Sequence, residues 1–390
     1  MFELKQNLTN AILVNLDFGY GDYHGRLQEL QQLALSANLV IAGIVEGKRT
    51  RPDATTFIGS GKVEEIAQLA SNTNATLVVF NHDLSPAQQR NLSVRLKCNV
   101  VERTSLILDI FAQRAKSYEG RLQVELAQLE HLATRLIRGW THLERQKGGI
   151  GLRGPGETQL ETDRRLIRKR VKLLKEKLST LQCQRTVQRR QRQRAQILSV
   201  SIVGYTNAGK STLFNKLTAA QSYAADQLFA TLDTTTRKLY LSEAGTVIVS
   251  DTVGFIRDLP HTLVAAFRAT LEETVQADIL LHVIDASAPN WNEQADQVNK
   301  TLKDIGADTI PQIQILNKSD LMVSLIAAGT KYVRDEYGRM NRICISAKTG
   351  EGLDFLRGAL AESILEHSKK MDRESAVGTK EIIEVHASMQ

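Results

Sequence analysis

The segment Gly204-Tyr-Thr-Asn-Ala-Gly-Lys-Ser211 constrains the fold more than any other feature of this chain. It fits the Walker A pattern, in which glycines let the backbone wrap phosphates, a lysine neutralises their charge and a serine hydroxyl binds Mg²⁺. The apolar run 197–203 precedes it and a helical pattern, 212–217, follows it. This context predicts an α/β nucleotide-binding domain, with Lys210 acting in catalysis and Ser211 as a metal ligand. The residues expected at the phosphates are Gly204, Tyr205, Thr206, Asn207, Ala208, Gly209, Lys210 and Ser211.

A second motif, Asp251-Thr252-Val253-Gly254, follows the apolar run 246–250. An aspartate at a strand end can hold Mg²⁺ through water, and a glycine here can offer its backbone N–H to the γ-phosphate and so respond to hydrolysis. We therefore expect Gly254 to act in catalysis. The motif is common in unrelated sequences, but at this distance after a Walker A loop it indicates a nucleotide-binding site.

Two later motifs indicate the base of the nucleotide. In Asn317-Lys318-Ser319-Asp320, the Asp320 carboxylate can accept two hydrogen bonds from the N1–H and the exocyclic amino group of guanine. Adenine presents no such donor pair, so a buried acceptor would stay unpaired. In Ser346-Ala347-Lys348, the backbone N–H of Ala347 can meet the guanine oxygen. The motifs predict hydrolysis of GTP to GDP and phosphate, and the region 197–365 resembles the Ras-like GTPase domain.

In the first 117 residues, four apolar, β-prone runs alternate with four helical patterns. This alternation predicts a small α/β domain with a parallel sheet. The expected strands are 12–16, 39–45, 77–80 and 100–101, and the expected helices are 26–37, 62–70, 86–96 and 105–115. We interpret Gly59-Ser60-Gly61-Lys62 as a loop-to-helix turn, because its glycine spacing departs from a Walker loop; a second phosphate site is the alternative.

The segment 118–196 has a different periodicity. Two runs follow the spacing of a coiled-coil seam and predict a helical hairpin. The seam positions are Leu122, Leu126, Leu129, Ala133, Leu136, Trp140 and Leu143, and then Ile167, Val171, Leu174, Leu178 and Leu181. Between the runs, residues 147–157 hold five glycines and a proline, which cannot continue a helix. We interpret this stretch as a functional tip that conforms to phosphate-rich surfaces, and a flexible linker is the alternative.

The net charge of +7 comes from one segment. Residues 161–194 contain thirteen Lys or Arg and three acidic residues, a net charge of +10, so the rest of the chain carries −3. Such a field attracts polyanions, and a solvated helix face is the alternative. Because no aromatic platform or zinc finger accompanies it, we expect contacts with the shape and phosphates of nucleic acid and no sequence-specific binding of DNA.

Other features limit the class of protein. No apolar run approaches the ~20 residues needed to span a bilayer, and residues 1–10 lack the pattern of a secretory signal. We expect a cytoplasmic monomer without an integral membrane segment, and peripheral membrane association stays open. Cys98, Cys183 and Cys344 have neither disulfide nor zinc-ligand spacing, so we expect reduced, structural cysteines. The expected cofactor is Mg²⁺.

The segment between the Walker A motif and the Asp251–Gly254 motif indicates a particular family. Phe229-Ala230-Thr231-Leu232-Asp233 resembles switch I of the HflX family, and the segments 149–163 and 251–257 also resemble that family. The resemblance covers nearly the whole chain. It implies that residues 229–233 line the nucleotide and that Thr231 is a magnesium ligand and takes part in catalysis. A generic threonine–arginine pattern would favour Thr235 or Thr236, and Thr234 stands where family members usually have proline.

The sequence therefore predicts four regions and one main function. The regions are an N-terminal parallel α/β domain (1–117), a basic helical hairpin with a glycine-rich tip (118–196), a Ras-like P-loop GTPase domain (197–367) and a tail (368–390). The family resemblance implies a cytoplasmic GTPase that binds the large ribosomal subunit and its RNA and splits or rescues stalled ribosomes. The alternative is a signalling or membrane-associated GTPase switch with a protein effector.

The residue directly after Gly254 predicts the speed of the reaction. Ras-like enzymes commonly place a glutamine there to orient the attacking water. This chain has Phe255, whose phenyl ring can neither orient nor deprotonate water. We therefore expect slow hydrolysis by the isolated protein.

Overall fold

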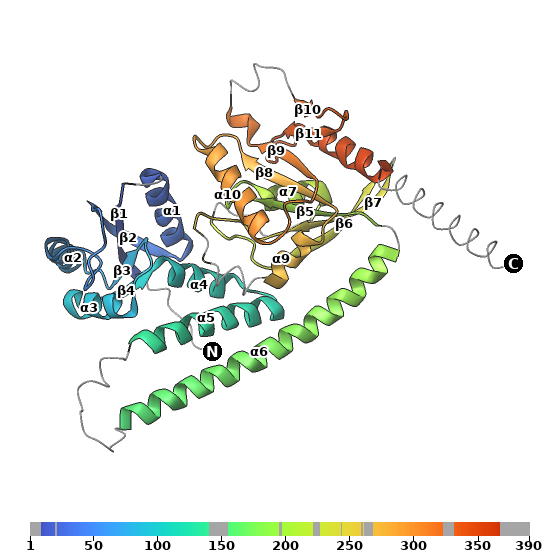
Figure 1. Ribbon diagram of the computed structural model, residues 1–390. Helices are drawn as coiled ribbons and strands as arrows, with labels where there is room; N and C mark the ends of the chain where they lie inside the picture. The colour runs from blue at the N-terminus through green and yellow to red at the C-terminus, as the bar shows by residue number, and fades with distance from the viewer. Residues whose placement is uncertain are drawn as a thin grey trace, which may run out of the picture. The chain divides into compact units, whose positions relative to one another are not determined.

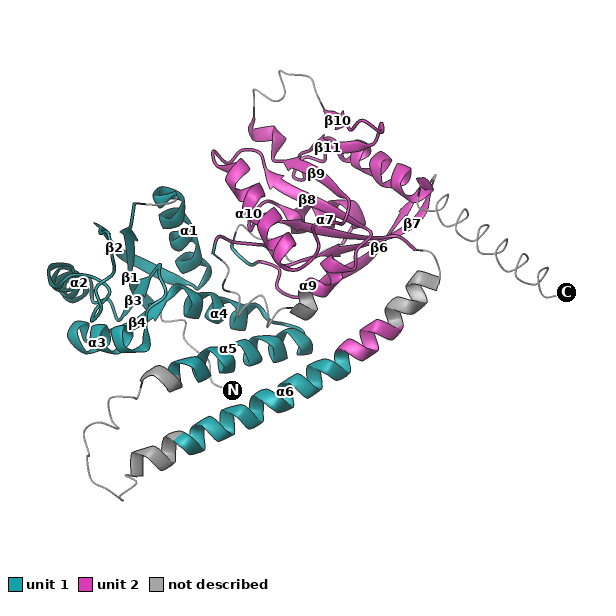
Figure 2. Ribbon diagram, viewed as in Figure 1, with its two compact units in different colours: residues 1–181, 227–229, 258–267 teal, residues 182–226, 230–257, 268–390 magenta. Residues whose placement is uncertain are grey.

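The computed structural model describes residues 9–19, 22–139, 155–194, 197–220, 227–242, 244–258, 260, 268–322 and 331–366. The chain divides into two compact units (Figure 2). Unit 1 comprises residues 1–181, 227–229 and 258–267, and unit 2 comprises residues 182–226, 230–257 and 268–390. The mixed α/β fold class predicted from the sequence is confirmed.

Unit 1 begins with a four-stranded parallel sheet in the order β2-β1-β3-β4 (Figure 1). The prediction of alternating strands and helices is confirmed to within a few residues at each end. The strands are β1 (Thr9–Asp17), β2 (Leu39–Lys48), β3 (Leu77–Phe80) and β4 (Asn99–Glu102), and the helices are α1 (Tyr23–Ser36), α2 (Ser60–Thr73), α3 (Pro86–Leu96) and α4 (Arg103–Arg114).

The central strand β1 is buried on both faces, as a parallel sheet between two layers of helices requires. Residues 11–16 of β1 are all buried, so both faces of the strand are packed, as expected when helices cover both sides of a parallel sheet. Helix α2 contributes Val63, Ile66 and Ala70 to the core at helical spacing. Gly59 is the residue that caps α2, so the predicted loop-to-helix turn is confirmed. The phosphate-site alternative for this turn stays open.

The predicted hairpin is formed by α5 (Tyr118–Gly139) and α6 (Pro155–Arg194). Its seam consists of the predicted residues: Leu122, Leu126, Leu174 and Leu178 are buried together, with Leu129, Val171 and Leu181 packed against them. Seam positions Trp140 and Leu143, and the tip as far as Gly154, lie outside the described residues. The non-helical tip was predicted to extend to residue 157, and this boundary is wrong. Helix α6 begins at Pro155, because proline fits the first position of a helix, where no backbone N–H is needed.

Unit 2 contains a seven-stranded sheet in the order β10-β11-β9-β8-β5-β7-β6 (Figure 1). Strands β6 and β10, at the two edges, are antiparallel to their neighbours, and the inner strands run parallel. The strands are β5 (Ser199–Gly204), β6 (Thr235–Leu241), β7 (Gly245–Asp251), β8 (Ile279–Asp285), β9 (Gln312–Asn317), β10 (Tyr332–Arg334) and β11 (Met340–Cys344). The helices are α7 (Lys210–Thr218), α9 (Arg268–Val275), α10 (Trp291–Asp304), the 3₁₀ turn η1 (Ser319–Leu321) and a helix at 353–366.

This topology places the sequence motifs at one edge. The motif residues follow β5, β7, β9 and β11, which are all parallel to one another through β8. Loops at the carboxyl ends of parallel strands form the usual ligand crevice of an open α/β sheet. No described helix combines the length and apolar character that a membrane span requires, and the three cysteines form no disulfide.

One buried histidine in this sheet predicts acid sensitivity. His282 in β8 is 1% exposed, and neither ring nitrogen has a hydrogen-bond partner among the described residues. Burial, with a smaller effect of the Lys210 charge, lowers the pKa of His282 to about 4. The unfolded chain binds this proton at higher pH than the folded chain, so stability is lost as pH falls below about 6.5, by about 2 kcal/mol at pH 5.

We therefore expect His282→Leu to reduce the loss of stability between pH 7 and pH 5 by about 2 kcal/mol. Leucine fills a similar volume and takes up no proton. Urea unfolding at the two pH values measures the effect, with His24→Leu as the matched control in unit 1. The same pH dependence in wild type and His282→Leu would contradict this account.

Candidate active site

The Walker loop connects β5 to α7 and requires glycine at two points. A Cβ on Gly204, at φ +151°, would lie 2.2 Å from the carbonyl oxygen of Val283. A Cβ on Gly209, at φ +90°, would lie 2.2 Å from the Asn317 side-chain nitrogen. The loop then directs Lys210 inward, where its Nζ donates to the carbonyl oxygen of Tyr205 at 2.7 Å. Burial lowers the pKa of Lys210 to about 8, and Asp251 partly opposes this effect.

Three side-chain oxygens meet where a magnesium ion is expected. The Ser211 hydroxyl donates to Asp251 Oδ2 at 2.7 Å, Thr231 Oγ1 donates to the same atom at 3.1 Å, and the two hydroxyls lie 2.7 Å apart. Asp251 is fully buried, its pKa is raised by burial, and its Oδ1 atom has no hydrogen-bond partner among the described residues. Oxygen ligands with an unsatisfied carboxylate atom fit a hard divalent cation such as Mg²⁺.

The three candidates for the switch I threonine, Thr231, Thr235 and Thr236, differ in their hydrogen bonds. Thr235 and Thr236 belong to β6, and the Thr236 hydroxyl lies 3.3 Å from that of Ser250. Thr231 alone among the three candidates is hydrogen-bonded to the Ser211 and Asp251 pair. The structure therefore brings together Ser211, Thr231 and Asp251, and that Thr231 binds magnesium stays a prediction.

The segment after Asp251 is hydrogen-bonded to the Walker loop. The Thr206 N–H donates to the Phe255 carbonyl at 2.8 Å, and the Phe255 N–H donates to the Gly204 carbonyl at 3.1 Å. The Arg257 N–H donates to the Tyr205 hydroxyl at 2.9 Å in a buried position. Phe255 itself is 2% exposed, so its ring is buried.

Gly254 lies in contact with the Walker loop. A Cβ on this residue would come within 2.8 Å of both Lys210 Nζ and Thr206 Cγ2, and within 2.9 Å of Thr206 Cα. No side chain fits here without displacing backbone. The Gly254 backbone is therefore adjacent to the lysine that is expected to bind the β- and γ-phosphates.

At the base end of the site, Asn317 organises the loops. Its side-chain nitrogen donates to the Ala208 carbonyl at 2.8 Å, and its oxygen accepts the Ala347 N–H at 2.9 Å. Lys318 pairs with Asp285 at 2.7 Å. Ser319 and Ser346 are buried, whereas Asp320 and Lys348 are exposed and their side chains remain accessible to a nucleotide.

The ring of Phe229, a predicted binding residue, packs within unit 1. Phe229 belongs to unit 1, where its ring packs edge-to-face on Phe111 at 4.6 Å between centroids. The preceding residue, Leu228, donates its N–H to the Ser36 hydroxyl at 3.0 Å. That Phe229 binds the nucleotide stays a prediction. Among its neighbours, Leu232 is buried, and Ala230 and Asp233 are half-buried.

Sequence reasoning also missed contributors to the site. No local sequence motif predicts that the Tyr205 hydroxyl accepts a hydrogen bond from Arg257. The ion pair of Asp285 with Lys318 could have been anticipated, because Asp285 is the polar residue at the end of β8, next to β9. The Arg257 guanidinium is buried and pairs with Glu293 on α10 at 2.9 Å. These contacts hold the ends of the motifs in place.

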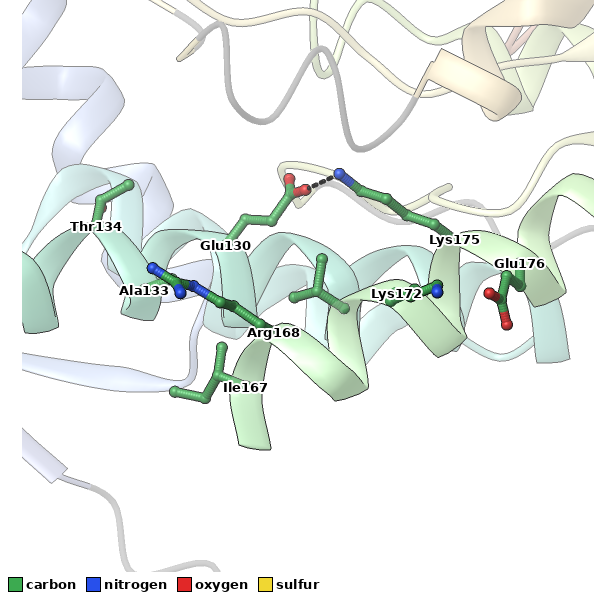
Figure 3. Close-up of a pocket in the computed structure, with 9 residues that line it drawn as sticks. Glu130, Ala133, Thr134, Ile167, Arg168, Lys172, Lys175 and Glu176 are labelled. Atoms are coloured by element: carbon green, nitrogen blue, oxygen red, sulfur yellow. Dashed lines mark ion pairs between the residues drawn. The ribbon is translucent and has the colours of Figure 1, made fainter. Parts of the chain in front are cut away.

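A second candidate surface lies on the hairpin. Ala133 of α5 and Ile167 and Val171 of α6 line a groove of about 600 Å³, with Arg168, Lys172, Lys175 and Glu176 of α6 around it (Figure 3). The seam opens here because Ala133 offers only a methyl group opposite larger side chains. Lys175 pairs across the groove with Glu130 at 2.8 Å. The groove thus has an apolar floor and a mainly basic rim.

The chain is similar to known proteins along most of its length. Residues 24–112, 114–192 and 199–318 match the families described as GTP-binding GTPase N-terminal, GTP-binding GTPase Middle Region and 50S ribosome-binding GTPase. GTPase HflX of Escherichia coli (strain K12) is 51% identical over 364 residues, which are 93% of this chain and 85% of that protein. GTPase HflX of Caldanaerobacter subterraneus subsp. tengcongensis is 47% identical over 369 residues, 95% of this chain and 84% of that protein.

A solved structure shares the fold. The crystal structure of the SsGBP and GDP complex aligns with a TM-score of 0.50 at 23% identity, over 92% of this chain and 99% of that chain. Fold and site together define a P-loop GTPase, an enzyme that binds guanine nucleotides and hydrolyses GTP. The chain belongs to the HflX family of GTPases, as the sequence resemblance indicated.

Proposed function

We propose that this GTPase binds the large ribosomal subunit through its RNA and splits or rescues stalled ribosomes, with hydrolysis as the signal for release. Support comes from the family description 50S ribosome-binding GTPase over residues 199–318 and from the charge of α6. We also propose that the protein acts in the cytoplasm as a monomer. The four regions, 1–117, 118–196, 197–367 and 368–390, are the proposed functional parts.

The exposed cations of α6 are the observation that carries this proposal. Arg170 and Lys175 are neutralised by Glu125 and Glu130 of α5. Five further cations are exposed and have no ion-pair partner among the described residues: Arg165, Arg168, Lys169, Lys172 and Lys177. Unpaired cations along one helix provide phosphate contacts whose strength does not depend on base sequence.

In the proposed nucleotide site, Lys210 binds the β- and γ-phosphates and the Gly254 N–H contacts the γ-phosphate. Ser211 and Thr231 would hold Mg²⁺ directly and Asp251 would hold it through water, and the bound ion would supply positive charge beside the phosphate oxygens. Asp320 accepts hydrogen bonds from guanine, and the Ala347 N–H donates to the guanine oxygen. Hydrogen bonds within the protein hold these loops together, so the site is largely preformed.

The partner is expected to accelerate the reaction. Phe255 is buried and provides no group that orients water, so the isolated protein should hydrolyse GTP slowly. We expect purified large subunits to raise the single-turnover rate at least about tenfold by ordering the switch segments. Single-turnover hydrolysis with and without large subunits measures this, with small subunits as the control.

Cosedimentation with separated subunits in GTP and GDP tests the binding itself. Binding to large subunits should require GTP. A fast basal rate that large subunits leave unchanged would refute the proposed coupling, and a complex that does not weaken with salt would favour a protein effector.

A further inference from the structure

The Walker loop contains a buried hydroxyl that the fold does not use. Thr206 is 6% exposed, and its Oγ1 atom has no hydrogen-bond partner among the described residues. Buried polar atoms are nearly always paired, because an unpaired one loses its hydration without compensation. A valine of the same shape would avoid this cost. The hydroxyl is therefore explained if a ligand or a water of the reaction supplies the missing partner.

The position of Thr206 identifies that partner. Gly254 touches both Thr206 and Lys210, since a Cβ on Gly254 would lie 2.8 Å from Thr206 Cγ2 and 2.8 Å from Lys210 Nζ. The Thr206 methyl group and Cα thus lie beside Gly254 and Lys210, the two residues that the proposed function places at the γ-phosphate. The bond from the Thr206 N–H to the Phe255 carbonyl, at 2.8 Å, fixes this arrangement.

The site also lacks a water-orienting group at the usual place. Phe255, directly after Gly254, is buried in the core. Thr206, in the Walker loop, lies beside Gly254, and its hydroxyl is attached to the same Cβ as the methyl group that faces Gly254. Its hydroxyl has one proton to donate and two lone pairs to accept, so it can contact a phosphate oxygen and a water at the same time.

We propose that Thr206 is a catalytic residue that orients the attacking water. Its Oγ1 accepts a hydrogen bond from the water, and its hydroxyl proton is donated to a γ-phosphoryl oxygen. The water oxygen forms a bond to the γ-phosphorus, the bond to the β–γ bridging oxygen breaks, and its electron pair stays on GDP. One water proton passes to a γ-phosphoryl oxygen, and inorganic phosphate leaves. The threonine keeps its own proton throughout.

This inference rests on the proposed γ-phosphate contacts of Lys210 and Gly254. Single-turnover hydrolysis of Mg–GTP by the full chain, without ribosomal subunits, tests it. Thr206→Val should lower the rate about tenfold, because the loop keeps its shape and loses one hydrogen bond to the water. Thr206→Ser should restore the rate to within about threefold of wild type. GDP affinity should change less than about twofold in both variants.

Stability separates a catalytic role from a structural one. Because the hydroxyl has no partner in the described part of the chain, Thr206→Val should melt at or above the wild-type temperature. Thr274→Val is the matched control: it removes a fully buried hydroxyl of unit 2, 3.4 Å from that of Ser201, and should not change the rate.

The outcomes are distinguishable. A wild-type rate for Thr206→Val, an equal loss in Thr206→Ser, or a lowered melting temperature with Thr206→Val would each overturn the inference. Lys210→Ala tests the underlying site, since it should abolish hydrolysis. Normal hydrolysis by Lys210→Ala would refute the proposed phosphate site itself.

Discussion

Replacing Asp320 with asparagine is expected to lower GTP affinity about a hundredfold and to allow xanthosine triphosphate to bind in its place. The Asp320 carboxylate is exposed at η1 and available to guanine. Two charge-assisted hydrogen bonds, to N1–H and the exocyclic amino group, would be removed, and the asparagine amide N–H would face the donor group of guanine. Xanthine carries a carbonyl oxygen at that place, so the amide donates to it and specificity changes.

The measurement is a competition between GTP and xanthosine triphosphate for a fluorescent nucleotide. Asp354→Asn is the matched control, because Asp354 is a highly exposed carboxylate of the same unit that lies outside the proposed site. Its nucleotide affinities should equal those of wild type. Unchanged GTP affinity in Asp320→Asn would show that another group reads the base.

Reversing three charges of α6 should weaken binding to the large subunit about a hundredfold at ~0.1 M salt. The variant combines Arg165→Glu, Lys169→Glu and Lys172→Glu, three exposed cations without an ion-pair partner among the described residues. Each bound phosphate releases counterions, so the slope of log affinity against log salt should flatten by roughly 0.7 to 0.9 for every phosphate that the variant no longer binds. GTP hydrolysis by the isolated variant should stay at the wild-type rate.

Cosedimentation across a salt series measures both quantities. The matched control reverses three exposed lysines of unit 2, Lys216, Lys300 and Lys303, and changes the net charge by the same amount. We expect it to weaken binding by less than about threefold. Equal weakening in the two variants would mean that net charge, and not the hairpin, controls the association.

Much of the architecture was predictable because its causes are local. Alternating apolar runs and helical patterns located the strands of unit 1, and the heptad spacing identified Leu122, Leu174 and Leu178 as seam residues of the hairpin. The start of α6 was misplaced by the weight given to five glycines. Proline at the first helical position allows the helix to begin at Pro155.

The sequence by itself determined the class of protein. Binding of phosphates and guanine requires particular residue types at strand ends, and each of these binding motifs is a short, contiguous stretch of sequence. The family resemblance already implied Thr231, but only the tertiary structure showed its hydroxyl beside that of Ser211, and only it placed the ring of Phe229 on Phe111. It also revealed that the Thr206 hydroxyl has no hydrogen-bond partner among the described residues and that Thr206 lies beside Gly254. These facts depend on how segments far apart in the chain pack against one another. Such packing follows from many small contact energies that no local pattern records.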